Sequence, residues 1–507
     1  MRTAARTAAF MAALTLVSKF MGFLREIFLA GFFGTSYITD AYVMASAIPG
    51  IIFAGVFTSV SVSYMPIFSQ IVEKEGIQKG NRFTSEAINL SMGIALIASV
   101  LGIIFSDQVV TVFANGFTAE TAALTSFYLK ITFAYVVFTA ATGLLTSWLQ
   151  YRGIFLSPLI AGYLQSGFVL LSIIVSAFYS HYYLAYGLLI GHFLQLVAVA
   201  AIAKKKGFTY VPTLKIGKSA KEIMILAVPV FIGSTVNQIN SFVDKMLASG
   251  LKEGSVAALN YSNLLINLIT ALTITVIVTI IYPRLTQALA QEDFDKFNDS
   301  ISKGMNITVI IGLPCSLGAM LYSDAAVRLV YERGAFDAAS TDLTSSAFFY
   351  YAIGLTFIAL NALLVKVYYS MQDMRTPVIC GAIGAATNIT LNIILVGIMA
   401  HRGLALATSI AAVVNTLLLG FLIGRKYPDV KIIESRAKMI KIIASGIAAV
   451  GLSYAAYIGL QSVKADLSPF ILLAAAVVVA CISYLILLKL CKVEELNMLK
   501  DLLRKKQ

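Results

Sequence analysis

Long apolar stretches separated by short polar connections run along the whole chain. A helix needs about 20 predominantly apolar residues to cross the hydrocarbon core of a bilayer, and fourteen stretches meet this requirement. The pattern therefore predicts an all-α polytopic membrane protein with about 14 transmembrane helices. The predicted spans are residues 8–33, 39–70, 85–106, 121–150, 155–179, 183–203, 221–250, 256–289, 301–323, 342–371, 376–399, 403–424, 439–461 and 467–490.

Composition supports the same fold class. Of the 507 residues, 59% are hydrophobic and only 12% are charged, which is typical of polytopic membrane proteins and not of soluble ones. The four cysteines lie in apolar spans or at their ends, and there are three histidines. We therefore expect neither a disulfide framework nor a metal centre rich in histidine. Arg2 and Arg6 precede an apolar run as in a signal peptide, but the lack of an A-x-A-like cleavage site predicts a retained first span.

The basic residues indicate how the chain is oriented. With the N-terminus placed inside the cell, the inside connections hold 28 of the 38 Lys and Arg residues and the outside connections hold five. Cytoplasmic connections of membrane proteins are enriched in Lys and Arg, so this split predicts that both termini are cytoplasmic. It also explains the net charge of +13 without nucleic acid, because the basic connections face anionic lipid headgroups.

The sequence repeats itself at an offset of 217 to 219 residues, which indicates a duplicated six-span unit. Because six is even, both copies cross the membrane in the same direction, and we expect two pseudo-symmetric six-helix lobes plus two C-terminal helices. The lobes are placed at residues 1–210 and 211–430, and the two extra helices with a basic cytoplasmic tail at 431–507. The paired segments are Pro66–Gln70 with Pro283–Gln287, Gly116–Thr121 with Ala335–Ser340, and Ser157–Pro158 with Thr376–Pro377.

Polar residues follow one face of the first span, within a stripe roughly 120° wide at about 100° per residue. An intramembrane charge costs at least a few kcal/mol, so the stripe must face protein or a water-filled cavity. Lys19 and Arg25 would then offer two cations to an anionic passenger. The alternative is a structural ion pair of Arg25 with Glu26 or with Asp40 on the next span. The stripe consists of Thr15, Ser18, Lys19, Gly22, Arg25 and Glu26.

The second half carries polar residues within its own spans. One explanation is hydrogen bonding between helices, worth about 0.6 kcal/mol for each bond. Asp244 suggests more, because a buried carboxylate near amide and hydroxyl oxygens resembles a site for Na⁺ or a proton; the alternative is that it neutralises Lys245 or Lys19. The residues are Asn237, Asn240, Ser241, Asp244, Lys245, Asn260, Asn263, Asn267, Thr270, Asn361, Lys366, Asn388, Asn392 and Thr408.

Two lobes that bring polar stripes towards a shared centre are typical of secondary transporters. The chain has no Walker A, G-x-S-x-G or H-E-x-x-H motif and no connection long enough for a catalytic domain. We therefore predict a transporter, not an enzyme, without a cofactor and driven by Na⁺, H⁺, the membrane potential or the substrate's own gradient. A glycan transferase would need catalytic residues in a long outer loop, and the longest, Ser323–Asp342, has no histidine.

Several motifs resemble those of the MurJ (MviN) lipid II flippases. The resemblance covers spans 1 to 12 almost continuously and is most specific from residue 331 to 409, whereas spans 13 and 14 match only in number and hydrophobicity. The motifs are Ser18–Glu26, Asp40–Tyr42 with Ile48-Pro49, Val243–Ser249, Ala258–Ser262, Tyr282–Leu285, Tyr331–Phe336, Tyr368–Pro377, Asn388-x-x-Leu-Asn392 and Gly403–Ser409.

The resemblance implies the multidrug/oligosaccharidyl-lipid/polysaccharide exporter fold, with two six-helix lobes in a V and two extra helices that form a groove for a lipid tail. It implies flipping of lipid II, the undecaprenyl-pyrophosphate-linked peptidoglycan precursor, from the inner to the outer leaflet of the bacterial cell membrane. We expect alternating access in a monomer whose partners are lipid II or a related glycolipid, membrane lipids and cell-wall synthesis proteins.

By position, the resemblance makes Lys19, Arg25 and Asp40 cavity residues that contact the substrate headgroup. It assigns a cation site, taken as a Na⁺ site, to four residues of the second half. The candidate substrate-binding residues are Ser18, Lys19, Arg25, Glu26, Asp40, Asn237, Lys245 and Asn263, and the candidate cation ligands are Asp244, Asn388, Asn392 and Thr408.

Three positions depart from the family pattern. Lys19 stands where the family usually has arginine, the run Pro49–Ala54 lacks an arginine that many members carry, and Leu264 stands where many members have another. The cavity is therefore expected to be less cationic than in much of the family. The alternatives are a flippase for another polyprenyl-linked glycan and a cation-coupled multidrug exporter of the same superfold. A scaffold without transport activity would leave the buried charges unexplained.

Overall fold

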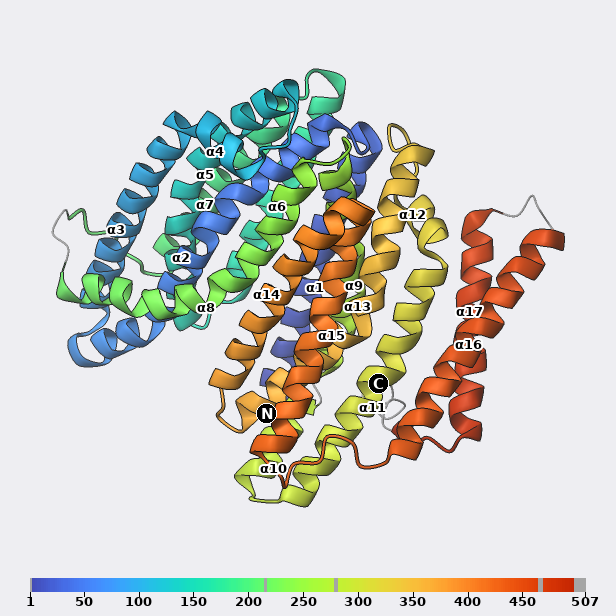
Figure 1. The fold of residues 1–507 in the computed structure, drawn as a ribbon. Helices are drawn as coiled ribbons and strands as arrows, with labels where there is room; N and C mark the ends of the chain where they lie inside the picture. The colour runs from blue at the N-terminus through green and yellow to red at the C-terminus, as the bar shows by residue number, and fades with distance from the viewer. Residues whose placement is uncertain (1, 214–216, 278–280, 464–467, 497–507) are drawn as a thin grey trace. The chain divides into compact units, whose positions relative to one another are not determined.

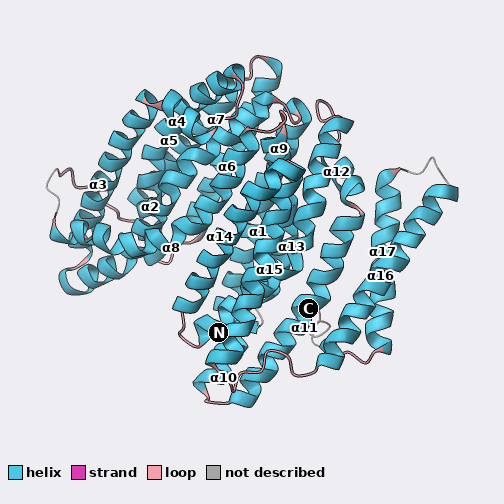
Figure 2. Cartoon of the chain, viewed as in Figure 1, coloured by secondary structure: helices cyan, strands magenta, loops and turns pink. Residues whose placement is uncertain are grey.

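Helices make up the regular secondary structure of the protein. The computed structural model describes residues 2–213, 217–277, 281–463 and 468–496, and within these ranges Figure 2 shows helices and loops without a strand. Eleven helices in the described ranges are long and apolar enough to cross a bilayer. The prediction of an all-helical polytopic membrane protein is therefore confirmed.

The chain divides into two compact units. Figure 1 colours the helices in chain order, from blue at the N-terminus to red at the C-terminus. The first consists of Met1–Ala257 with Arg333–Asp337, and the second of Ala258–Glu332 with Ala338–Gln507. Helix α8 (Lys218–Ser249) falls in the first unit because it packs against helices α2 and α3. The lobes of the sequence repeat, which divide at residue 210, stay a prediction. The other helices before residue 257 are α1 (Arg2–Phe33), α2 (Tyr37–Glu75), α3 (Ile77–Ile104), α4 (Ser106–Phe113), α5 (Ala119–Tyr151), α6 (Leu156–Phe178) and α7 (Tyr183–Lys205).

The later helices repeat the pattern of the earlier ones. The short helices α4 and α12 were not predicted, and they begin 217 residues apart, at Ser106 and Ser323. The stretch Ser323–Asp342, expected as a loop, therefore starts with a helix. The predicted span 256–289 is found as α9 and α10, with residues 278–280 outside the described ranges. The helices are α9 (Ser255–Val276), α10 (Tyr282–Ala290), α11 (Phe294–Leu321), α12 (Ser323–Tyr331), α13 (Ala338–Ser370), α14 (Arg375–Met399), α15 (His401–Lys426), α16 (Arg436–Val463) and α17 (Pro469–Leu490).

Aromatic side chains fill the core of the first unit between α2, α3 and α5. The rings of Tyr64 and Phe83 stack with centroids 5.7 Å apart, and the Tyr64 hydroxyl lies 2.6 Å from Thr84 Oγ1. Trp148 is fully buried, and its Nε1 donates a hydrogen bond of 3.0 Å to Asn81 Oδ1. Because buried polar ends of aromatic residues need partners, these bonds fix how α2 and α5 lie against α3.

In the second unit, α16 and α17 form a pair that packs on the other helices through α11 and α12. Ser453 of α16 donates to Ala476 O of α17 at 2.6 Å, and the Tyr322 hydroxyl lies 2.7 Å from Ser453 Oγ. Water-excluding lipid makes such bonds between helices an important source of specific packing.

Large apolar side chains such as Phe178 and Ile398, each 75% exposed, lie on surfaces that suit contact with lipid tails.

A buried carboxylate closes the turn between α13 and α14. Asp373 accepts hydrogen bonds from Lys426 Nζ at 2.6 Å, from Thr376 Oγ1 at 2.6 Å and from the Tyr427 hydroxyl at 3.1 Å. Burial acts to raise the pKa of Asp373, but these hydrogen bonds outweigh it and hold the pKa well below its usual range. The carboxylate is therefore ionised and joins α13, α14 and α15.

Replacing Asp373 with alanine should lower the stability of the purified protein by about 2 kcal/mol, because several hydrogen bonds to one charged acceptor are lost. Thermal unfolding in detergent measures the effect. The control is Asp324→Ala, which removes an exposed carboxylate 3.4 Å from Arg328 on α12 and should change stability by less than about 0.5 kcal/mol. Equal shifts for the two variants would contradict the assignment.

Candidate functional site

Two adjacent residues of α1 form an ion pair within the first unit. Arg25 Nη2 lies 2.8 Å from Glu26 Oε1, and Arg25 Nε lies 3.3 Å from the same oxygen. Glu26 is buried, whereas 27% of the Arg25 side chain is exposed. An unpaired carboxylate in this position would cost several kcal/mol, so Arg25 allows Glu26 to lie in the interior. Of the two ion-pair partners predicted as alternatives for Arg25, the structure has Glu26.

Arg25 also lies among aromatic residues of three other helices. Its charge interacts electrostatically with Tyr42 on α2, Tyr135 on α5 and His192 on α7. The rings of Tyr135 and His192 stack with centroids 4.2 Å apart and planes 8° apart. His192 Nδ1 lies 2.8 Å from Leu188 O, which orients the imidazole. Tyr135 and His192 thus form a stacked pair between α5 and α7, within electrostatic range of Arg25.

Lys245 on α8 extends this cluster. It interacts electrostatically with Asp244, its neighbour in the chain, and with Glu26 on α1. Its Nζ lies 3.5 Å from Ser241 Oγ. The first unit thus brings together two cations, Arg25 and Lys245, and two carboxylates. Opposite charges close to one another lower the cost of holding each away from water, and the cations offer hydrogen-bond donors to an anion.

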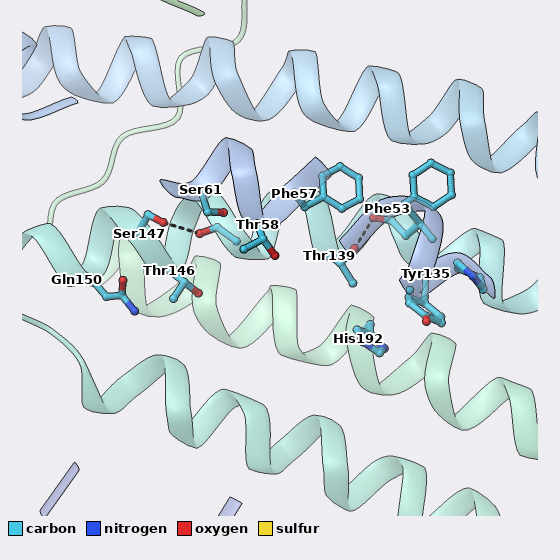
Figure 3. Close-up of a pocket in the computed structure, with 14 residues that line it drawn as sticks. Phe53, Phe57, Thr58, Ser61, Tyr135, Thr139, Thr146, Ser147, Gln150 and His192 are labelled. Carbon is cyan, nitrogen blue, oxygen red and sulfur yellow. Dashed lines mark hydrogen bonds between the residues drawn. The ribbon is translucent and has the colours of Figure 1, made fainter. Parts of the chain in front are cut away.

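A cavity of about 500 Å³ lies beside Tyr135 and His192 in the first unit. Figure 3 shows hydroxyl, amide and aromatic side chains from α2, α5 and α7 around it. None of the described residues that line it is Lys, Arg, Asp or Glu. Hydroxyl and amide groups both donate and accept hydrogen bonds without a fixed charge, so the wall is chemically suited to sugar or peptide groups. Besides Tyr135 and His192, its principal side chains are Phe53, Phe57, Thr58, Ser61, Thr139, Thr146, Ser147 and Gln150.

Asp40 caps the start of α9. Gly254 N donates to Asp40 Oδ2 and Ala257 N donates to Asp40 Oδ1, each at 2.7 Å. Helix α9 begins at Ser255, so these are N–H groups of the first turn, which have no partner within the helix. The carboxylate also faces the positive end of the helix dipole. Both oxygens of the buried Asp40 therefore contact backbone, and its contact with a headgroup stays a prediction.

The segment Arg333–Asp337 packs against the end of α1. Ala335 N donates a hydrogen bond of 2.8 Å to Gly31 O. Gly34 and Gly334 have φ angles of +57° and +60°, which favour glycine, and a Cβ on Gly34 would overlap Ala335 O. Like the Asp40 cap, this contact fastens the first helices of the chain to a segment from much later in the sequence.

The second unit brings together three of the four predicted cation ligands. Asn388 Nδ2 donates to Thr408 Oγ1 at 3.2 Å, and Asn392 Nδ2 donates to Asn388 Oδ1 at 2.9 Å. Both asparagines are fully buried. Asp244 belongs to the first unit, so its participation stays a prediction. Across the described residues, no group of three His, Cys, Asp or Glu side chains is placed to hold a metal ion, and amide and hydroxyl oxygens are the ligands this cluster can supply.

Four predicted substrate-binding residues remain, namely Ser18, Lys19, Asn237 and Asn263. Lys19 is exposed and Ser18 is half-buried on α1. Asn263, in the second unit, accepts a hydrogen bond of 2.6 Å from Asn267 Nδ2. Asn237 lies outside the residues whose side chains the structure describes.

Tyr135, His192 and the hydroxyl wall of the cavity were not predicted. A signal for the wall exists in the sequence, because Thr139, Thr146 and Gln150 recur at intervals of seven and four along α5, the spacing of one helix face. Nothing in the sequence places His192 beside them, since the contact depends on how α7 packs against α5.

The architecture matches solved membrane transporters. It is similar in fold to the inward-facing conformation of a multidrug resistance MATE family transporter of the MOP superfamily, with a TM-score of 0.67 and 16% identity over 81% of this chain and 94% of that one. It is also similar to a structure of lipid II flippase MurJ in an inward closed conformation, with a TM-score of 0.81 and 25% identity over 94% of this chain and 98% of that one. Together these likenesses show the fold of a multi-pass membrane transporter.

The family follows from the sequence comparisons. The family model described as lipid II flippase MurJ matches residues 29–478, and the chain belongs to this family. A probable lipid II flippase MurJ from Rhizobium meliloti is 27% identical over 427 residues, covering 80% of this chain and 78% of the relative. Lipid II flippase MurJ from Burkholderia cenocepacia is 27% identical over 423 residues, covering 80% and 81%.

Replacing Asp40 with alanine should destabilise the protein by at least about 2 kcal/mol, because two buried N–H groups of α9 lose their acceptor. Asp40→Asn keeps one acceptor oxygen and should have a smaller effect. Thermal unfolding in detergent measures both. Glu253→Ala is the control, since Glu253 accepts one exposed hydrogen bond from Tyr37 N at 2.8 Å. Wild-type stability of Asp40→Ala together with lost transport would instead favour direct contact with substrate.

Proposed function

We propose that this protein flips lipid II from the inner to the outer leaflet of the bacterial cell membrane and thereby supplies peptidoglycan synthesis. Membership in the MurJ family supports the substrate class. The observation that carries the proposal for this chain is the position of the Arg25 cluster beside a neutral cavity within one unit. Lipid II has the corresponding parts, which are an anionic pyrophosphate and a large neutral sugar portion that bears a peptide.

Arg25 and Lys245 are the proposed partners of the pyrophosphate. Arginine presents a planar set of donors that matches phosphate oxygens, and lysine acts as a compact point charge. Arg25 is already paired with Glu26 but remains partly exposed, so a phosphate could bind its other donors. Lys19, which is exposed on the same helix, is a third candidate. The prenyl tail would stay in the lipid.

The cavity between α2, α5 and α7 is the proposed place for the sugar portion. Phe53 and Phe57 offer apolar faces on which a sugar ring could stack, and the hydroxyl and amide groups around the cavity would bond to its hydroxyls. This division separates charge recognition from sugar recognition. It also offers an explanation for the absence of arginine after Pro49, since a neutral wall there would bind sugar rather than phosphate.

Transport would proceed by alternating access. For the outer side to open, the Asp40 cap and the hydrogen bond between Ala335 and Gly31 are the contacts we expect to break. A coupling ion can shift such an equilibrium only by its difference in affinity for the two states. We propose that Na⁺ or H⁺ acts at Asp244 together with the Asn388, Asn392 and Thr408 cluster. In this scheme both termini are cytoplasmic, which the enrichment of Lys and Arg in the connections on that side supports.

Removing the Arg25 side chain should strongly reduce transport. In a bacterium depleted of its own lipid II flippase, the wild-type chain should restore growth and the appearance of labelled lipid II in the outer leaflet. Arg25→Ala should reduce that signal at least about tenfold, because one charge-assisted phosphate contact is worth about 1.4 kcal/mol or more. Arg25→Lys should retain part of it.

Two controls make this result specific. Arg25→Ala leaves Glu26 buried without its ion-pair partner, so the double variant Arg25→Ala with Glu26→Ala removes that cost and tests the loss of the cation alone. Lys79→Ala removes an exposed cation that lies 4.0 Å from Glu75 and should transport normally. Full activity of the double variant would exclude Arg25 from headgroup binding. A well-expressed wild type that does not rescue would point to another polyprenyl-linked glycan.

A further inference from the structure

Helix α3 carries Asn81, Ser85 and Asn89 four residues apart, on one face. All three bond to the connection that follows α7. This connection, from Lys206 to Thr213, has neither helix nor strand structure, and Asn81, Ser85 and Asn89 come from successive turns of α3. The hydrogen bonds run from Asn81 Nδ2 to Gly207 O at 3.2 Å, from Val211 N to Ser85 Oγ at 3.0 Å, and from Asn89 Nδ2 to Thr213 O at 2.7 Å.

Residues four apart on an α-helix lie one above the other on one face, about 6 Å apart along its axis. Backbone groups outside helices and sheets need partners from elsewhere in the protein. Asn81, Ser85 and Asn89 supply such partners to Gly207, Val211 and Thr213. We call such a set of three residues a comb.

A second comb lies on α11, with Asn298, Ser302 and Asn306 each 217 residues after its counterpart. Its first two residues bind the connection that follows α15. Val430 is buried in this connection, as Phe208 is in the first. The hydrogen bonds run from Asn298 Nδ2 to Asp429 O at 2.9 Å, from Lys431 N to Asn298 Oδ1 at 2.9 Å, and from Glu434 N to Ser302 Oγ at 3.2 Å.

The third residue of the second comb binds a different part of the chain. Asn306 Nδ2 donates to Glu495 Oε1 at 2.6 Å, and Lys438 Nζ lies 3.4 Å from the same oxygen. Glu495 is 2% exposed and follows the end of α17. Where Asn89 fastens a connection in the first unit, Asn306 fastens the segment after the last transmembrane helix.

The two combs have the same residue types at equivalent positions, whereas the charged residues beside them differ. Arg82 Nε lies 3.2 Å from Glu86 Oε1, and at the equivalent positions Lys303 Nζ lies 2.7 Å from Asp299 Oδ2. The sign of each charge is thus exchanged between the units. Because the asparagine and serine positions are the same in both units, their hydrogen bonding to the connection is the feature that the two combs share.

We propose that the two combs are anchoring devices that make these connections part of their units. The first holds the connection up to Thr213 against α3. The second holds the pair α16 and α17 at both ends, through residues 429–434 before α16 and through Glu495 after α17. When the second unit moves, it therefore carries this helix pair with it. The inference is independent of which lipid the protein transports.

Limited trypsin digestion of the full chain in lipid nanodiscs tests the proposal, because each anchored segment begins or ends near a lysine. Asn89→Ala should speed cleavage after Lys206 about tenfold and leave cleavage after Lys492 unchanged. Glu495→Ala should do the reverse. Each variant removes two contacts: Asn89 donates to Thr213 O and accepts from the Tyr210 hydroxyl, and Glu495 accepts from Asn306 and Lys438. A tenfold change corresponds to about 1.4 kcal/mol of local stability. Asn81 is not the residue to change, because it also accepts the bond from Trp148.

The two variants serve as controls for each other, and Glu494→Ala is a further control. Glu494 precedes Glu495 but is 82% exposed, with its carboxylate 3.9 Å from Lys438 Nζ; its loss should leave both rates unchanged. The proposal is overturned if Asn89→Ala and Glu495→Ala raise both cleavage rates equally, which would indicate general loosening. It is equally overturned if neither variant changes its own site, or if Glu494→Ala matches Glu495→Ala.

Discussion

A polar group buried in the hydrocarbon core of a membrane needs a hydrogen-bond or ion-pair partner within the protein. An unsatisfied backbone or side-chain group there costs several kcal/mol. Each notable polar feature of this chain follows from that constraint. Glu26 lies inside beside Arg25, Asp40 accepts the first N–H groups of α9, and Asn388 bonds to Thr408 and Asn392. The constraint limits which helices can be neighbours, because each partner comes from a defined place in the sequence.

The two units have several elements at equal spacing in the sequence, but their polar residues differ in chemistry. The short helices α4 and α12 and the two combs keep their spacing across the repeat. The first unit holds the described cavity and the Arg25 cluster, whereas the second holds the buried amide cluster of Asn388 and Asn392. The proposed substrate recognition would then depend on features that the described part of the second unit does not repeat.

The sequence allowed the helices to be predicted because hydrophobicity along a single segment determines whether it can span a bilayer. The ion pair of Arg25 with Glu26 was one of two predicted alternatives, as both partners lie on one helix. The Asp40 cap could not be predicted, since its donors are backbone groups more than 200 residues away that look alike in any sequence. The same holds for the combs. The repeated asparagines are visible in the sequence, but their backbone hydrogen-bond partners cannot be predicted from it.

The Arg25 and Glu26 pair has an electrical consequence. Its two charges are consecutive in the chain, as are those of Asp244 and Lys245, so each pair moves with its helix as a unit of zero net charge. A full elementary charge crossing the membrane field gains about 2.3 kcal/mol for each 100 mV, whereas a neutral pair that shifts as one body gains almost nothing. Any sensitivity of the transport cycle to voltage must therefore arise from the charge of the cargo, from a coupling ion or from cations outside these two pairs.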